Sequence, residues 1–303
     1  MERTQTIFRH LNGAKPGPNA VSAAMYEGGG DDVVIVSALR TPICKSRRGG
    51  LKDTLVDDML QTVFTGVIND AGIDPSLIQD ICVGNVNQQG AGANTARFAQ
   101  FFSGIPETTS LMAVNRQCSS GLQACMNIAA SIKAGVIDIG MGAGAESLTC
   151  HPMGKQMGLV MNPKLGEYPK AADCLTPMGI TSENVAERFN VSREKQDRMA
   201  VQSHQKAAAA QKQGLFNAEI LPVHTKSVDK DGNETPVTIA ADDGVRGGTT
   251  MEILAKLTSQ NRTMWIPVGT IEAGHETYRA SQTTDQARIA QAIDQELLDY
   301  QNR

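Results

Sequence analysis

A sharp change from strand-type to helix-type sequence around Cys118 restricts the folds open to this chain more than any other feature. Residues 109–114 have the length and apolar character of a buried strand, and helical spacing of apolar residues begins at Leu122. Gly135 stands where the C-cap of that helix is expected. A strand that passes at once into a helix is a unit of α/β folds. The pattern predicts Cys118 as the first residue of the helix.

A cysteine in that position is a candidate nucleophile. Unpaired backbone N–H groups and the positive end of a helix stabilise an anion, and the thiolate is the reactive form of cysteine. The small residues after Cys118, at positions 119–121, let a substrate approach closely. The alternative is a buried structural cysteine, the commoner state of a free thiol. We expect Cys125 and Cys82 to be buried and inert in that way.

Composition and charge limit the classes of function that are expected. The 303 residues are enough for two domains, and a net charge of −4 gives no indication of a nucleic-acid partner. No apolar run has membrane-spanning length, so we expect no membrane span and a water-soluble protein. The six cysteines show no zinc-type spacing, so no metal site is predicted, and a reducing compartment is expected.

Strand-type and helix-type segments alternate along the first half of the chain. Strands are expected at 33–36, 81–86, 111–114 and 137–144, and helices at 55–68, 94–102 and after Cys118. This alternation predicts a mostly parallel sheet covered by helices. Ligands bind at the carboxyl ends of such strands, where Cys118 is placed.

The glycines of 140–145 have the spacing of a dinucleotide-binding pattern but not its structural context. A helix must follow that pattern directly, and Pro152 interrupts the segment. We interpret these glycines as positions of close packing against the Cys118 helix.

Residues 148–257 have a different character and predict an inserted α+β domain. Ser192 is a helix N-cap and Gly214 the end of that helix. Residues 220–223 and 236–239 predict a hairpin around the turn 231–233.

Residues 115–124 read Asn-Arg-Gln-Cys-Ser-Ser-Gly-Leu-Gln-Ala, which resembles the nucleophile segment of thiolases, in particular 3-ketoacyl-CoA thiolases of the peroxisomal type. Further resemblances follow in order at 36–42, 84–86, 144–147, 177–186, 241–246 and 254–257. The resemblance implies four parts of the chain. They are a targeting or disordered segment 1–30, a thiolase-like half 31–147 without its last strand, a coenzyme-A-binding loop domain 148–257 and a divergent tail 258–303.

The resemblance also implies an activity, that of an acetyl-CoA C-acyltransferase in fatty-acid β-oxidation. Such enzymes cleave 3-ketoacyl-CoA with a second coenzyme A, giving acetyl-CoA and a shortened acyl-CoA. Cys118 matches the residue that carries the acyl group as a thioester. Met178 and Gly179 match positions along the pantetheine channel, and Arg246 matches one near the adenine. Coenzyme A is then a substrate and no cofactor is implied. The alternatives are that Met178 only fills core and Arg246 is only a solvated charge.

The resemblance covers only part of a thiolase. The family's Asn-Glu-Ala-Phe, Gly-His-Pro and Cys-x-Gly motifs, which supply its histidine and its acid/base cysteine, do not occur in the sequence. We therefore expect very low turnover. The alternative function is a truncated, non-catalytic isoform that pairs with a full-length thiolase, and a homodimer is the other expected assembly. A ketoacyl synthase relative also carries a cysteine at a helix start, but the context of Cys118 and the long loop domain argue against it.

The first residues resemble an N-terminal peroxisomal targeting signal, with Arg3 followed after an interval by His10 and Leu11. Thr4 departs from the usual pattern. The resemblance implies a peroxisomal import receptor as a partner and the peroxisome as the location. A frayed terminus in a cytoplasmic protein and a mitochondrial transit peptide are the alternatives.

Overall fold

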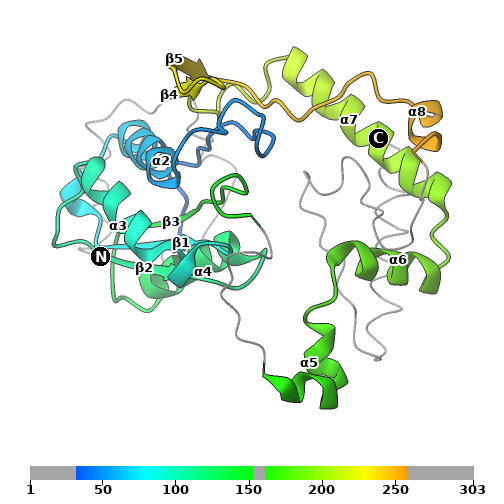
Figure 1. Ribbon diagram of the computed structural model, residues 1–303. Coiled ribbons are helices and arrows are strands. Elements are labelled where there is room, and N and C mark those ends of the chain that lie inside the picture. Colours follow the sequence, from blue (N-terminus) through cyan, green and yellow to red (C-terminus); the bar gives the residue numbers. More distant parts are fainter. Residues whose placement is uncertain (1–31, 153–161, 258–303) are drawn as a thin grey trace. The chain divides into compact units, whose positions relative to one another are not determined.

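The computed structural model describes residues 32–152 and 162–257, which form two compact units (Figure 1). The first unit contains the described part of Met1–Leu159 together with Gln211–Gly244. The second contains the described parts of Val160–Ala210 and Val245–Arg303. The predicted targeting segment 1–30 and the predicted tail 258–303 lie outside the described residues.

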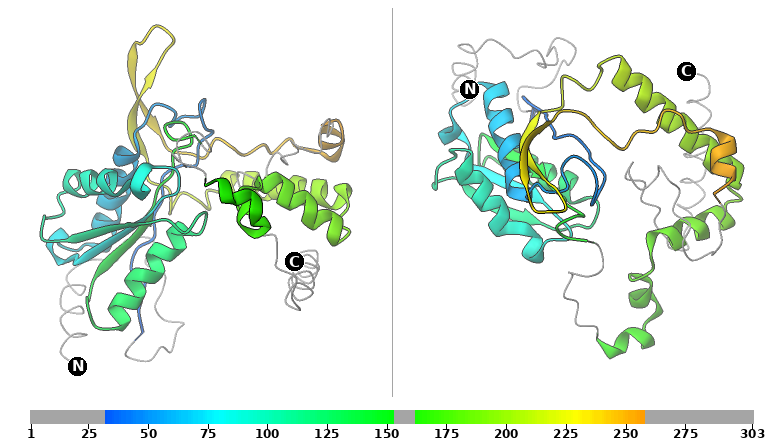
Figure 2. Two further views of the ribbon diagram at one scale, coloured as in Figure 1. Left: turned by 60° about the horizontal axis from the view of Figure 1, so that its bottom comes forward. Right: turned by 45° about the horizontal axis from the view of Figure 1, so that its top comes forward.

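A three-stranded parallel sheet lies at the centre of the first unit (Figure 2). Its strands are β1 (Asp80–Gly84), β2 (Ser110–Val114) and β3 (Gly140–Gly144), in the order β2-β1-β3. Asp80 lies opposite Ser110 on one side and Gly140 on the other, so all three strands end at the same edge. The predicted parallel α/β arrangement is confirmed.

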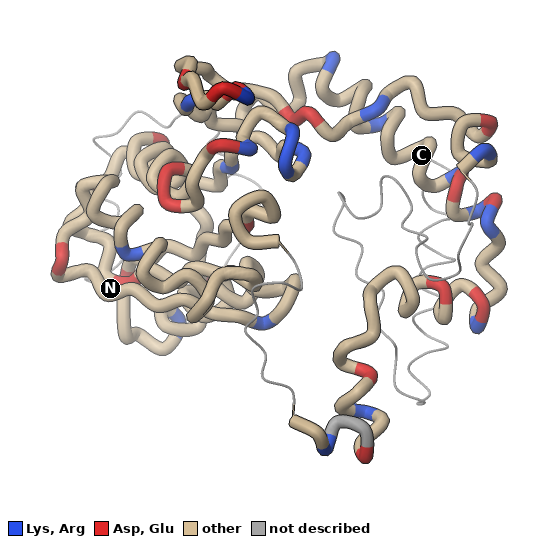
Figure 3. The backbone as a smooth tube through the Cα atoms, viewed as in Figure 1, with Lys and Arg blue, Asp and Glu red and all other residues tan. Residues whose placement is uncertain are grey.

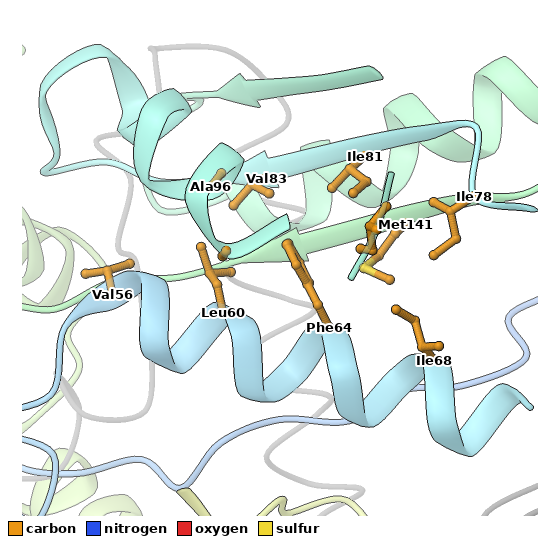
Figure 4. Packing of buried hydrophobic residues seen from close by; sticks show 11 residues of the cluster. Val56, Leu60, Phe64, Ile68, Ile78, Ile81, Val83, Ala96 and Met141 are labelled. Carbon is orange, nitrogen blue, oxygen red and sulfur yellow. The ribbon is translucent and has the colours of Figure 1, made fainter. Parts of the chain in front are cut away.

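Two helices cover one face of this sheet, α2 (Val56–Ala71) and α3 (Ala93–Phe102). The apolar residues of α2 recur every four positions, which places them on one stripe of the helix. That stripe packs against Ile81 and Val83 of β1 and Met141 of β3 (Figure 4). The buried residues of the α2 stripe are Val56, Leu60, Phe64 and Ile68. Gly72, with φ of 63°, ends α2 as a left-handed C-cap.

The helix α4 (Ser120–Lys133) covers the opposite face. Cys82 points to that face because side chains alternate along β1, and it packs with Ala124 and Ile128 of α4. A Cβ atom on Gly142 would lie 2.7 Å from the Cα of Cys125, so only glycine permits this close approach. The interpretation of the 140–145 glycines as packing positions is confirmed.

The predicted strand at residues 33–36 does not form. Val34, Ile35 and Val36 are 72%, 84% and 52% exposed, and none of them joins a sheet in the described part of the chain. A run of β-branched residues forms a strand only where a neighbouring backbone offers hydrogen bonds. Both sides of β1 are already occupied by β2 and β3, and the segment pairs with neither of their outer edges.

A hairpin is present, as predicted, and is formed by β4 (Val223–Val228) and β5 (Glu234–Ile239), which pair antiparallel around the turn at Gly232 (Figure 2). The predicted bounds of its first strand, 220–223, are wrong, because β4 begins only at Val223. It packs within the first unit, where the carboxylate of Asp53 accepts a hydrogen bond from the Val228 amide at 2.8 Å. We predicted the hairpin inside a loop domain of 148–257. Compact units and evolutionary domains need not coincide, so those domain boundaries stay predictions.

The second unit is mainly helical. Its helices are α5 (Pro169–Asp173), α6 (Met178–Arg188), α7 (Arg193–Lys212) and α8 (Met251–Ala255). The hydroxyl of Ser192 accepts a hydrogen bond from the Lys195 amide at 3.3 Å, which confirms the predicted N-cap of α7. Ala200 and Val201 of α7 form a small core with Leu254 of α8. Acidic and basic positions are interspersed along both units (Figure 3).

Candidate functional site

Cys118 lies in a tight turn between β2 and α4, at the carboxyl edge of the sheet. The helix begins at Ser120 with Ser119 as its N-cap residue, so our prediction that Cys118 is the first helical residue is wrong by two positions. The reason is that Cys118 and Ser119 belong to a turn, which the hydrogen bond from the Ser120 amide to the Gln117 carbonyl closes at 3.0 Å, and Ser119 has non-helical φ and ψ of −89° and 12°. Cys118 therefore stands just before the helix, with its side chain exposed.

Side chains within the turn hold its backbone. The Oδ1 of Asn115 accepts a hydrogen bond from the Gln117 amide at 2.9 Å, which locally stabilises the left-handed conformation of Gln117, whose φ is 52°. The Oγ of Ser120 accepts from the Arg116 amide, and the Oγ of Ser119 donates to the Arg116 carbonyl, each at 2.9 Å. The conformation next to Cys118 is thus fixed by three neighbouring side chains.

Glycines let the start of α4 sit directly on the ends of β1 and β3. A Cβ atom on Gly84 would lie 2.4 Å from the backbone of Ser120, and one on Gly144 would lie 3.3 Å from the Cα of Gly121. No side chain fits at Gly84 without moving the backbone. These contacts bring the Cys118 turn onto the sheet edge where ligands of parallel sheets bind.

The cysteines that we expected to be buried, Cys82 and Cys125, differ from each other in burial. Cys82 is fully buried as predicted, and burial raises the pKa of its thiol. Cys125 is exposed, so our prediction that it is buried is wrong. It flanks the stripe of α4 that faces the sheet, where Ala124 and Ile128 take the buried positions.

The described part of the second unit contains a largely apolar pocket of about 290 Å³. Arg246 lines it, and its role near the adenine of coenzyme A stays a prediction. The rest of its lining comes from Gly248, Thr249, Ile253, Leu254 and Leu257. Met178 and Gly179 do not line this pocket; they open α6, where Met178 is 52% exposed.

His204 is a residue of this region that we did not predict. It is 7% exposed, and its Nδ1 accepts a hydrogen bond from the Arg246 amide at 3.2 Å. The Nε2 atom therefore carries the proton of the neutral ring, and it has no partner among the described residues. The sequence signal was available, since His204 continues the buried spacing of Asp197, Ala200 and Val201 on α7.

Within residues 32–152 and 162–257, no cluster of three histidine, cysteine, aspartate or glutamate side chains is arranged to hold a metal ion. None of the described helices is long and apolar enough to cross a membrane.

A parallel sheet covered by helices on both faces, with a strand that turns directly into a helix at its carboxyl edge, defines a protein of the α/β class. The family model described as "Thiolase, N-terminal domain" matches residues 33–289, and the chain therefore belongs to the thiolase family. The match continues past Leu257, so it does not support the predicted divergence of 258–303, which stays a prediction.

Individual relatives agree with this assignment. The chain is 52% identical over 262 residues to "3-ketoacyl-CoA thiolase B, peroxisomal" of Rattus norvegicus, covering 85% of this chain and 61% of the rat protein. The dimeric peroxisomal thiolase of Saccharomyces cerevisiae matches with a TM-score of 0.68 and 40% identity, over 78% of this chain and 60% of the yeast chain.

A second yeast structure, of peroxisomal 3-ketoacyl-CoA thiolase, is described as five-layered and built from two core domains of identical topology. It matches with a TM-score of 0.58 and 38% identity, over 73% of this chain and 58% of that chain. The predicted fold class, a thiolase-like α/β fold, is thereby confirmed. The chain spans about three fifths of the length of these relatives, between 58% and 61%.

Proposed function

We propose that this chain carries the nucleophile of a thiolytic acyltransferase that acts on 3-ketoacyl-CoA. The observation that carries the proposal is the exposed Cys118 thiol, held in a fixed turn at the start of α4. The names of the relatives supply the substrate class, since the rat protein is a 3-ketoacyl-CoA thiolase. An exposed thiol before a helix N-terminus is the environment in which cysteines become reactive.

The proposed reaction has two steps. The Cys118 thiolate attacks the 3-keto carbon, the bond between C2 and C3 breaks, and its electron pair leaves with acetyl-CoA, which takes up a proton. The thiol of a second coenzyme A loses its proton and attacks the Cys118 thioester, which releases the shortened acyl-CoA and restores the thiolate. Coenzyme A is thus a substrate, and the Arg246 pocket is the proposed site for its adenine end.

Both proton transfers need a partner group, and the resemblance assigns these groups to motifs that this sequence does not contain. General acid–base catalysis typically contributes about 10²-fold or more for each group. We therefore propose that turnover by this chain is at least about 100-fold below that of a full-length thiolase.

The test supplies acetoacetyl-CoA and coenzyme A to the purified chain and follows the loss of the ketoacyl absorbance. We expect a slow loss that disappears in Cys118→Ala and persists in Cys125→Ala. An equal rate in Cys118→Ala would refute the proposal that Cys118 is the nucleophile. Turnover equal to that of a full-length thiolase would refute the proposed impairment.

A second candidate function is that of a non-catalytic partner of a full-length thiolase. It is favoured by the outer face of α4, where Leu122 and Met126 are 66% and 54% exposed. The yeast relative is dimeric, and its structure has two core domains of identical topology. We propose that a second thiolase core domain covers this face, because exposed apolar patches mark interaction sites.

Association is measured by size-exclusion chromatography with light scattering on mixtures of the chain and a full-length thiolase. The double variant Leu122→Glu and Met126→Glu should abolish a mixed complex. Phe98→Glu, at a 50% exposed position of α3, is the matched control and should leave it intact. A complex that both variants retain equally would count against this face.

The rat and yeast relatives are peroxisomal, and we propose the same location for this chain. The supporting residues Arg3, His10 and Leu11 lie outside the described residues. Residues 1–30 fused to a fluorescent protein should enter peroxisomes through an import receptor, and Arg3→Ala or His10→Ala should abolish entry. A diffuse cytosolic signal from the unsubstituted fusion would contradict this location.

A further inference from the structure

Each strand of the sheet is followed by a polar segment at the same edge. Residues 85–87 follow β1, residues 115–118 follow β2, and residues 145–147 follow β3. The segments after β1 and β3 have no role in the reaction proposed above. Parallel strands bring these segments together, so contacts between them lie beside Cys118 rather than elsewhere on the sheet.

Glu146, after β3, ties down the segment after β1. Its Oε2 accepts a hydrogen bond from the Val86 amide at 3.0 Å, and its Oε1 accepts from the Asn87 amide at 3.4 Å. Oε1 also accepts from the Nδ2 of Asn85 at 3.3 Å. Both carboxylate oxygens are therefore used, and an ionised acceptor makes stronger hydrogen bonds than a neutral one.

Asn85 completes this connection from inside the protein. It is only 2% exposed, and its Nδ2 also donates to the Ala145 carbonyl. Its Oδ1 accepts a hydrogen bond from the Gln88 amide at 2.8 Å. The side chain thus bonds on both sides, and the segment after β1 is anchored to β3 and to itself.

The same peptide segment is bonded on its other side to the Cys118 turn. The Nδ2 of Asn115 donates to the Val86 carbonyl at 3.1 Å, while the Oδ1 of Asn115 accepts from the Gln117 amide. The Val86 N–H therefore donates a hydrogen bond to Glu146, and the Val86 carbonyl accepts one from Asn115. A continuous series of hydrogen bonds runs from Glu146 through Val86 and Asn115 to Gln117, the residue before Cys118.

We propose that Glu146 and Asn115 are positioning residues for Cys118, which hold Gln117 in its left-handed conformation from the ends of β3 and β2. The chemical consequence for Cys118 rests on the proposed function, whereas the coupling between Glu146 and Gln117 does not. A left-handed non-glycine residue persists only where its surroundings hold it. Loss of either side chain lets Gln117 relax, and Cys118 then leaves the start of α4.

Two substitutions separate the parts of this series. Glu146→Gln keeps the size of the side chain, but its NH₂ group cannot accept, so one of the two amide contacts is lost. Asn115→Ser keeps a short acceptor for the Gln117 amide but cannot reach the Val86 carbonyl. Glu107→Gln is the matched control, because Glu107 is an exposed carboxylate of the same unit outside this series.

Two measurements are made on each variant and on the double variant. The first is the iodoacetamide rate of Cys118 relative to the exposed Cys174, with the buried Cys82 as a report on folding. The second is hydrogen exchange of the Val86 and Gln117 amides. If Glu146 has only a local structural role, Glu146→Gln accelerates exchange at Val86 only. If Glu146 positions Gln117, the substitution also accelerates exchange at Gln117.

We expect the Cys118 to Cys174 rate ratio to fall about three- to ten-fold in Glu146→Gln, with Cys82 still protected and Glu107→Gln unchanged. The double variant should be no slower than the slower single variant, because both act through one series. Unchanged Gln117 exchange in Glu146→Gln, or effects that multiply in the double variant, would overturn the proposal. If Cys118 is no faster than Cys174 in the unsubstituted chain, the proposed function falls instead, and Gln117 exchange alone decides the positioning role.

Discussion

Arg40 and Asp242 lie 202 residues apart in the sequence and are joined by two parallel hydrogen bonds. Nη1 donates to Oδ1 at 2.8 Å and Nη2 donates to Oδ2 at 3.0 Å. The Nε of Arg40 also donates to Glu219 at 2.7 Å. This bidentate pair fastens the segment 211–244 to the start of the first unit, and it gives a structural role to two of the motifs that resemble thiolases.

The Arg40 pair should make the first unit sensitive to acid. Burial alone would raise the pKa of Asp242, but the hydrogen bond from Arg40, the Ile43 amide and the Arg40 charge outweigh it and hold that pKa below its usual value. A depressed pKa stabilises the folded state above the ordinary value of about 3.9, and this contribution is lost as pH falls through the folded value.

Asp242→Asn should therefore lower the free energy of unfolding at pH 7 by about 2 kcal/mol and flatten its decline below about pH 4. Denaturant unfolding at pH 7, 4 and 3 measures both effects. Asp231→Asn, at the exposed hairpin turn, is the control and should behave like the unsubstituted chain. An unchanged acid slope in Asp242→Asn would contradict this account.

The thiols should react with iodoacetamide in an order set by exposure and pKa. Cys118 should react first, the exposed Cys125 and Cys174 next, and Cys82 last. Burial, followed by the charge of Asp243, raises the pKa of Cys44 to about 11, so on the order of one Cys44 in a thousand is a thiolate at pH 8. Mass spectrometry of adducts at sub-stoichiometric reagent tests the order. Faster labelling of Cys44 or Cys125 than of Cys118 would defeat it.

Coenzyme A should bind weakly to the Arg246 pocket. One exposed arginine contact contributes about 1 kcal/mol, so we expect a dissociation constant on the order of a millimolar. Arg246→Ala should weaken binding several-fold in titration calorimetry. The control is Arg198→Ala, whose exposed guanidinium pairs with Glu194 away from the pocket lining. Micromolar binding that is indifferent to Arg246→Ala would place the site elsewhere.

His204 should support this pocket through its Nδ1 atom. His204→Asn places an amide oxygen near the position of Nδ1 and should retain the hydrogen bond from the Arg246 amide. His204→Ala leaves that amide without its acceptor and should cost about 1 to 2 kcal/mol of stability. Thermal unfolding of both variants, with and without coenzyme A, provides the comparison. Equal destabilisation by the two substitutions would show that the hydrogen bond is not what His204 contributes.

Local patterns predicted the elements whose stability is decided locally. The helix at 55–68 and the caps at Ser192 and Gly214 each depend on neighbours within a turn or two, and the structure confirms them. The prediction of a strand at 33–36 was wrong because a strand depends on a partner strand that its own residues do not specify. The prediction that Cys125 is buried was wrong for a related reason, because the sequence does not show which side of α4 faces the sheet.

The candidate site divides in the same way. The position of Cys118 between β2 and α4 followed from the sequence to within two residues. The link from Glu146 through Val86 to Asn115 did not, because it joins three strand ends that are distant in sequence. His204 was overlooked although its spacing on α7 indicates burial, whereas its hydrogen bond with the Arg246 amide joins residues 42 apart and follows from no local pattern.

The measurement that tests the central claim most directly is the search for an acyl-thioester on this chain. The chain is incubated with acetoacetyl-CoA, quenched in acid and mapped by mass spectrometry, beside Cys118→Ala and Cys125→Ala. The account predicts an acetyl group on Cys118, present in Cys125→Ala and absent in Cys118→Ala. Acetylation of any other cysteine in preference to Cys118, or none on Cys118 when a full-length thiolase treated alike is acetylated, would contradict it.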